Sequence, residues 1–196
     1  VYKRQLLRRM NRKHNIEDYL KIVDDIHELL PAATIFTDII VGFTGETDEQ
    51  FENTAQLMLD VQFNMAYVAK YSPRVGARSA RWEDDIPPQQ KSERLARLSE
   101  ILKRTSLAHN EKMVGETYRV LIDGKDRRVD GALTGRTEGK LPIRILNASE
   151  KLIGSIRPIE IVSAAELSLT GKLAESQKKQ SRRTAFPANV QEPISP

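Results

Sequence analysis

The segment from residue 34 to residue 61 places the strongest constraint on the fold. An apolar run rich in β-branched residues, 34–41, ends at the turn Gly42-Phe-Thr-Gly-Glu46, and Thr47-Asp-Glu-Gln50 then has the pattern of a helix capping box. This order predicts a buried strand, a tight turn and a helix that ends near residue 61. Loops that follow parallel strands hold the ligand contacts of many α/β enzymes, so this turn is a candidate for a ligand contact.

The rest of the first half continues the alternation of helices and strands. Apolar spacing and the positions of Pro and Gly predict a helix at 16–30, a strand at 64–70, a loop at 71–77 and a helix from Pro88 to about 112. Such alternation favours parallel βα units. Two strands neither close a barrel nor form a stable parallel sheet alone. Because the chain also starts at Val1 rather than Met, we expect a fragment whose other strands lie upstream.

The second half has a different pattern. Short apolar stretches at 118–122, 131–133, 143–146 and 159–162 are separated by turn signals. This spacing predicts a small antiparallel β-barrel of the OB-like kind. Residues 174–196 are rich in Ser, Gln, Lys, Arg and Pro and have no periodicity, so we expect a disordered basic tail. The expected divisions are therefore 1–112, 113–173 and 174–196, and the fold class is α/β followed by a small β-barrel.

Composition narrows the classes of function. The 196 residues carry a formal net charge of +4, with basic residues gathered near both ends, which suits a polyanionic partner. No apolar run is long enough to span a membrane. The chain has no cysteine, which excludes disulfides, thiolate zinc sites and iron–sulfur ligation within these residues. The three histidines lack metal-ligand spacing, so we expect no metal site, and we assign no catalytic residue.

Two places are candidates for binding. The turn at 42–46 is either a plain βα turn or a ligand contact, and its neighbouring acids, which include Glu46 and Asp48, favour a nucleoside over a phosphate. In the second half, Leu133-Thr-Gly-Arg-Thr137 is either a hairpin turn with scattered charges or a surface for RNA. For the RNA reading the candidate residues are Arg119, Arg127, Arg128, Gly135, Arg136, Lys140 and Arg144. We expect the pair Asp84-Asp85 to be exposed and without a partner.

Several segments together resemble a known family. They are Met10-Asn-Arg-Lys-His14, Asp38-Ile-Ile-Val-Gly-Phe-Thr-Gly-Glu-Thr47, Tyr71-Ser-Pro-Arg-Val-Gly76, Asp84-Asp-Ile-Pro87 and Lys91…Arg94-Leu95. In this order they resemble the radical S-adenosylmethionine (SAM) methylthiotransferases, and most closely the MiaB-type enzymes that modify tRNA. Residues 115–173, with Leu133-Thr-Gly-Arg-Thr137 and Leu152-Ile-Gly154, resemble the TRAM RNA-binding domain of that family. The resemblance covers about residues 6 to 173.

The resemblance implies a function for the longer protein. The family transfers a methylthio group to C2 of N6-isopentenyladenosine beside the tRNA anticodon, using SAM and two 4Fe-4S clusters. It implies a cytoplasmic enzyme, which we expect to be a monomer; the sulfur donor is not identified. The residues that it implies for contacts with the cofactor or substrate are Arg12, Asp38, Ile40, Gly42, Tyr71, Ser72, Pro73 and Arg74.

The chain also departs from the family pattern. The Cys-x3-Cys-x2-Cys motif is absent, so this chain alone is expected to be inactive. Thr44 and Val75 stand where the family usually has proline, which loosens both loops.

Alternative functions remain open. One is a methylthiotransferase for threonylcarbamoyladenosine tRNA or a ribosomal protein. Others are a non-catalytic TRAM-type RNA-binding protein and an inactive structural fragment.

Overall fold

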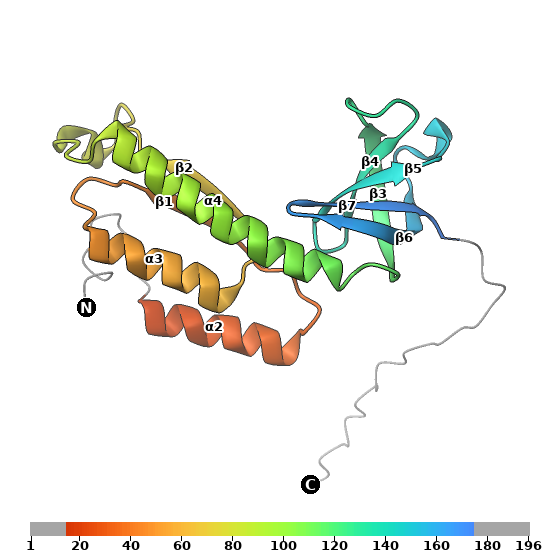
Figure 1. The fold of residues 1–196 in the computed structure, drawn as a ribbon, viewed down its shortest axis with the longest axis horizontal. Coiled ribbons are helices and arrows are strands. Elements are labelled where there is room, and N and C mark those ends of the chain that lie inside the picture. Colours follow the sequence, from red (N-terminus) through yellow and green to blue (C-terminus); the bar gives the residue numbers. More distant parts are fainter. Residues whose placement is uncertain (1–14, 175–196) are drawn as a thin grey trace, which may run out of the picture.

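The computed structural model describes residues 15–174. It contains an α/β half and a closed β-barrel, joined by one long helix (Figure 1). The elements of the first half are α2 (Ile16–Leu29), β1 (Phe36–Val41), α3 (Asp48–Val61), β2 (Met65–Lys70), the 3-10 turn η1 (Arg78–Arg81) and α4 (Pro88–Glu111). Those of the barrel are β3 (Thr117–Lys125), β4 (Leu133–Thr137), β5 (Pro142–Leu146), η2 (Glu150–Leu152), β6 (Ile156–Ala165) and β7 (Ser168–Leu173). The α/β class and the small barrel are confirmed. Arg12 and, of the expected tail at 174–196, residues 175–196 lie outside the described residues.

The helices of the first half begin where the sequence predicts. The Asn15 side chain accepts a hydrogen bond from the Asp18 N–H and caps α2. Thr47 and Gln50 form the reciprocal capping box of α3, with each side chain bound to the backbone N–H of the other. Pro88 occupies the first turn of α4, where a missing N–H costs nothing.

The α/β half has one covered sheet face and one open face. Strands β1 and β2 pair in parallel, from Phe36 opposite Met65 to Val41 opposite Lys70. All three helices contribute to a core on one face. Side chains alternate along a strand, so Asp38, Ile40 and Tyr67 lie on the opposite, exposed face. A two-stranded parallel sheet that is bare on one face agrees with the expectation of a fragment.

The barrel differs from its prediction in two details. Its strand order is β3-β4-β5-β7-β6, and the β5–β7 pair is parallel rather than antiparallel. The sequence did not predict β7, because Ser168–Leu173 alternates a single buried leucine with Gly171 and polar residues. A Cβ at Gly171 would lie 2.7 Å from the Glu160 carbonyl oxygen, so the glycine allows a close approach of two strands.

Residues 133–137 are likewise a strand and not a hairpin turn, so that alternative is wrong. Their side chains alternate into the barrel core, with Leu133 and Thr137 buried and Arg136 exposed. Gly135 was a candidate RNA contact, but it is buried, and a Cβ there would lie 2.6 Å from the Leu121 carbonyl oxygen. Its role in the barrel is therefore to let β3 and β4 approach each other.

Within residues 15–174, no helix has both the length and the apolar character that crossing a membrane requires.

Candidate cofactor edge and RNA-binding surface

The first candidate site lies at the carboxyl edge of β1 and β2. Because the strands are parallel, the turn after Val41 and the loop after Lys70 start side by side, and the Tyr71 N–H donates to the Val41 carbonyl at 2.8 Å. The structure thus places Tyr71, the first residue of the segment 71–74, beside the strand end that leads into Gly42. Asp38 and Ile40 lie on the open face of the sheet that leads to this edge.

The turn at residues 42–46 has its own carboxylate partners. Gly42 has a φ of 67°, and its N–H donates to the Glu46 carboxylate at 2.6 Å. The Gly45 N–H donates to Asp85 at 2.8 Å. A phosphate cradle needs backbone N–H groups that point at the ligand, and here two glycine N–H groups are occupied by carboxylates. The structure therefore gives no support to a phosphate cradle at this turn, and the nucleoside contact stays a prediction.

Glu46 is held from the opposite side by Arg94 of α4. The two side chains are only 3% and 4% exposed, and Arg94 donates to the Glu46 carboxylate at 2.7 Å. A second guanidinium nitrogen of Arg94 donates to Asp48 at 2.6 Å. Burial raises the pKa of Glu46, while the Gly42 N–H and Arg94 act in the opposite direction. Glu46 therefore faces into the protein and fixes the turn, rather than facing a ligand.

Asp84 and Asp85 also hold this edge, so the prediction that they lack partners is wrong. Asp84 accepts two hydrogen bonds from the buried Lys91 ammonium, at 2.5 and 2.6 Å, and Asp85 binds Gly45. The sequence contained one signal of this arrangement. Lys91 and Arg94 are three residues apart on α4, so they share a helix face with which the acids can pair.

The aromatic residues of the edge pack against one another. Phe43 contacts the Tyr71 ring edge-on at 4.8 Å and the Trp82 ring at 6.0 Å. The Tyr71 hydroxyl donates to the Ser79 carbonyl at 3.2 Å. Tyr71 is buried, so its ring supports the loop, whereas Ser72, Pro73 and Arg74 are exposed and accessible to a ligand. The resemblance treated all four alike.

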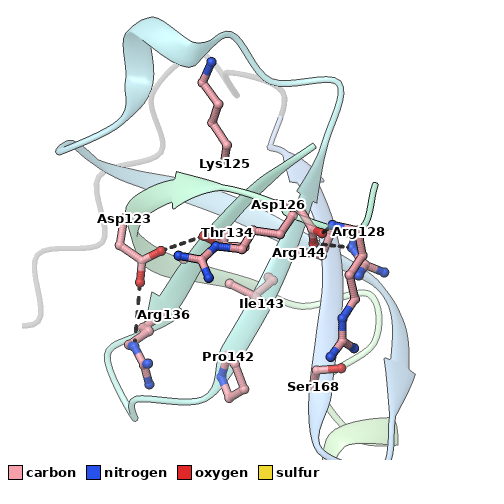
Figure 2. A pocket seen from close by; sticks show the side chains of 12 residues that line it. Asp123, Lys125, Asp126, Arg128, Thr134, Arg136, Pro142, Ile143, Arg144 and Ser168 are labelled. Carbon is pink, nitrogen blue, oxygen red and sulfur yellow. Dashed lines mark hydrogen bonds and ion pairs between the residues drawn. The ribbon is translucent and has the colours of Figure 1, made fainter. Parts of the chain in front are cut away.

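The second candidate site is a hollow of about 450 Å³ on the outside of the barrel, which Figure 2 shows from close by. Of the predicted RNA contacts, those that line it are Arg127, Arg128, Gly135, Arg136 and Arg144. Arg119 and Lys140 lie outside: Arg119 pairs with Glu138 at 2.9 Å, and Lys140 occupies the turn after β4 with a φ of 63°. The residues that the sequence did not single out include Asp123, Asp126 and Ser168.

The arginines of the hollow fall into two groups. Arg144 donates to Asp126 at 2.6 Å, and Arg136 lies 3.7 Å from Asp123 (Figure 2). Arg127 and Arg128 line the same hollow, and within residues 15–174 their side chains have no acidic partner. Two unpaired guanidinium groups beside two oriented ones form a surface suited to phosphate oxygens.

Asp126 organises the loop that carries these arginines, and it makes the loop sensitive to acid. Its carboxylate accepts from Arg144 and from the backbone N–H groups of Arg128, at 2.7 Å, and Val129, at 3.1 Å. The Arg144 side chain, followed by the Arg128 N–H, lowers the pKa of Asp126 below its ordinary value of 3.8.

A lowered folded pKa means that the carboxylate stabilises the loop above pH 3.8 and that this contribution disappears as pH falls further. We expect the amide NMR signals of Arg128 and Val129 to shift together below about pH 4, with a midpoint under 3.8. In Asp126→Asn the same titration should vanish. A midpoint at or above the ordinary value would contradict the role given to Asp126.

The chain does not supply ligands for a metal cofactor in its described part. Residues 15–174 contain no group of three or more His, Cys, Asp or Glu placed to hold a metal ion. The sequence has no cysteine, so no thiolate is present for an iron–sulfur cluster. These residues do not fit a cluster. A nucleoside cofactor fits better, because the Thr44 hydroxyl at the edge is buried without a hydrogen-bond partner in the described part of the chain.

Comparison with known proteins assigns both halves. Residues 2–58 match the model of the radical SAM superfamily, and residues 111–174 match that of the TRAM domain. Three relatives share the name tRNA-2-methylthio-N(6)-dimethylallyladenosine synthase. The protein from Ehrlichia chaffeensis is 40% identical over 85% of this chain, that from Symbiobacterium thermophilum 42% over 87%, and that from Oceanobacillus iheyensis 40% over 88%.

The chain covers only part of these relatives, namely 38%, 36% and 33% of their respective lengths. The match nevertheless includes both halves of the chain, in the order in which the structure joins them. The chain is therefore similar to the radical SAM methylthiotransferases over most of its own length, with a match to part of a radical SAM domain followed by a match to a TRAM domain.

Proposed function

We propose that this chain is the C-terminal part of an enzyme that adds a methylthio group to C2 of N6-isopentenyladenosine beside the tRNA anticodon. The observation that carries the proposal is identity of 40% or more, over at least 85% of the chain, to three synthases whose name states this product. The arginine-lined hollow on the TRAM barrel supports an RNA substrate. A tRNA substrate in turn suggests a cytoplasmic enzyme, and a monomer remains our prediction.

The cofactor edge suits SAM. Bound beside an iron–sulfur cluster held by the rest of the enzyme, SAM would supply the radical chemistry that removes a hydrogen atom from the substrate. In this chain, Asp38, Ile40 and Gly42 are inferred to flank its adenosine, with the Asp38 carboxylate able to accept hydrogen bonds from hydroxyl or amino groups. The exposed segment Ser72–Arg74 is inferred to meet cofactor or substrate. The carboxylates of Glu46 and Asp85 keep the turn in shape before any ligand arrives.

A chimera tests the activity directly. The N-terminal portion of the Symbiobacterium thermophilum relative that precedes the matched region is joined to this chain, reconstituted anaerobically and incubated with SAM and tRNA from cells that lack the modification. We expect mass spectrometry of digested nucleosides to detect 2-methylthio-N6-isopentenyladenosine. The same chimera with the cluster cysteines changed to alanine is the negative control, and the intact relative is the positive one.

The other outcomes separate the alternatives. Methylthio product on threonylcarbamoyladenosine alone would transfer the assignment to that branch of the family. An active positive control beside an inactive chimera that still binds tRNA would favour the non-catalytic RNA-binding reading.

A further inference from the structure

The long helix α4 contacts both candidate sites. Near its N-terminus, Lys91 and Arg94 hold the cofactor edge through Asp84 and Glu46. Near its C-terminus, Asn110 is bonded to β6 of the barrel. The helix has 24 residues and so extends about 36 Å, and Arg94 and Asn110 are about 24 Å apart along its axis. In Figure 1 the barrel lies at the C-terminal end of α4, and the cofactor edge at the other end.

A second set of contacts joins the barrel to the amino ends of the strands. The Thr34 hydroxyl donates to the Gly139 carbonyl in the turn between β4 and β5 at 2.7 Å. A Cβ at Gly139 would lie 2.6 Å from the Thr34 methyl group, so the glycine permits this approach. Phe36, the first residue of β1, packs against the barrel core. The barrel is thus attached at the end of the sheet opposite the cofactor edge.

The same helix also ties the strand ends to one another. The Ser106 hydroxyl is fully buried and donates to the Asn64 carbonyl at 2.8 Å. Asn64 in turn accepts from the Ile35 N–H at 2.7 Å, one residue after Thr34. These bonds connect α4, the amino end of β2 and the amino end of β1, so that movement of Thr34 is restricted by the helix that carries Asn110.

Asn110 is kept in this contact at a cost. Its side-chain nitrogen donates to the Ala165 carbonyl at 2.9 Å, but its side-chain oxygen is buried without a partner among residues 15–174. A buried acceptor without a partner lowers stability, because it has lost its hydrogen bonds to water and gained none in the protein. An apolar side chain avoids that cost but cannot select one orientation of β6, whereas the directional bond of an amide can.

We propose that α4, Thr34 and Asn110 hold the TRAM barrel at a fixed separation from the cofactor edge. Thr34 and Asn110 are positioning residues in this arrangement. This inference rests on the proposed function. The RNA segment that binds in the hollow is then remote from the nucleoside at the cofactor edge. The substrate is then an extended RNA that reaches both places, and the fixed separation selects which nucleoside arrives at the edge.

The distance between the two halves tests this directly. Because the chain has no cysteine, Glu49→Cys on α3 and Lys151→Cys on η2 give two unique, exposed sites for spin labels. We expect double electron–electron resonance on the full chain to give one narrow distance distribution. Adding Thr34→Val and Asn110→Ala should at least double its width, while circular dichroism still reports a folded chain.

Matched variants separate positioning from general loss of stability. Thr105→Val removes a hydroxyl whose bonds, among residues 15–174, are to carbonyls of its own helix, and it should leave the distribution narrow. Thr34→Ser keeps the hydroxyl donor that Thr34→Val removes. As a single substitution at residue 34, Thr34→Ser should therefore keep the distance distribution narrow. A broad distribution in the labelled chain without further changes would overturn the proposal, as would an unchanged width in the Thr34→Val/Asn110→Ala variant.

A parallel binding assay distinguishes failure of this inference from failure of the proposed function. The hollow does not include Thr34 or Asn110, so their variants should bind tRNA within about twofold of the unsubstituted chain. If the distances behave as expected but no variant binds tRNA, the RNA function is wrong and the fixed separation remains. A tRNA affinity that falls in these variants while the distance distribution stays narrow would show that the two residues act on the hollow itself, which would contradict a positioning role.

Discussion

Replacing Arg94 with leucine is expected to lower the free energy of unfolding by about 3–5 kcal/mol, because it leaves the Glu46 carboxylate buried without its cationic partner. Both side chains are almost completely buried, and Arg94 also donates to the Glu46 carbonyl and to Asp48. Urea unfolding followed by circular dichroism measures the change. The loss should be smaller at pH 5 than at pH 7.5.

The pH dependence follows from the Glu46 carboxyl group. Burial raises its pKa, and removing Arg94 raises it further, so the folded variant takes up a proton as pH falls. A group with a raised folded pKa favours the folded state increasingly as pH drops through that value. The variant should therefore regain stability relative to the unsubstituted chain in mild acid.

Arg97 provides a matched control on the same helix. Its guanidinium lies 5.5 Å from the Phe51 ring, against 5.3 Å for Arg94, and it pairs with Glu52. The difference is burial, since the Arg97 side chain is 51% exposed. Arg97→Leu should change stability little, because an exposed ion pair is screened by water. Equal losses in the two variants would show that contact with Phe51, and not the buried ion pair, holds the turn.

Removing Arg127 and Arg128 together is expected to weaken tRNA binding by about ten- to a hundredfold at low salt. Both line the hollow and lack acidic partners in the described part of the chain, so their guanidinium groups are available to phosphate oxygens. Each lost phosphate contact should also reduce the slope of log affinity against log salt by about one. Fluorescence anisotropy with labelled tRNA over a salt series measures both quantities.

The control removes an arginine elsewhere on the surface. Arg104→Ala lies on the exposed face of α4, away from the hollow, and should leave the salt slope within experimental error. An unchanged slope in Arg127→Ala/Arg128→Ala would exclude the hollow as the phosphate-binding surface. Arg119 and Lys140, which lie outside the hollow, would then become the predicted contacts to phosphate.

The sequence by itself determined the local structure of the first half. Local signals depend on neighbours within a few residues, so the sequence was enough to predict them. They are the caps at Asn15 and Thr47, the glycine at the end of β1 and the proline at the start of α4. The order of motifs also indicated the family. The strand β7 was not predicted, because its glycine and polar residues do not give a clear alternation of apolar and polar side chains. Gly171 is required by the close approach of β6, and that contact is not visible in the local sequence of β7.

Only the tertiary structure decided what the charged and polar residues do. Glu46 resembled an acid beside a ligand turn, and Asp85 an exposed acid without a partner. Their partners, Arg94 and Gly45, are 48 and 40 residues away in the sequence, and both acids support the turn. Five of seven predicted RNA contacts line one hollow, although they come from three separate segments. Pairing across such separations depends on how elements pack, which residue spacing does not encode. The strand and the turn at residues 34–47 were therefore predictable, whereas the side chains that hold the turn in place were not.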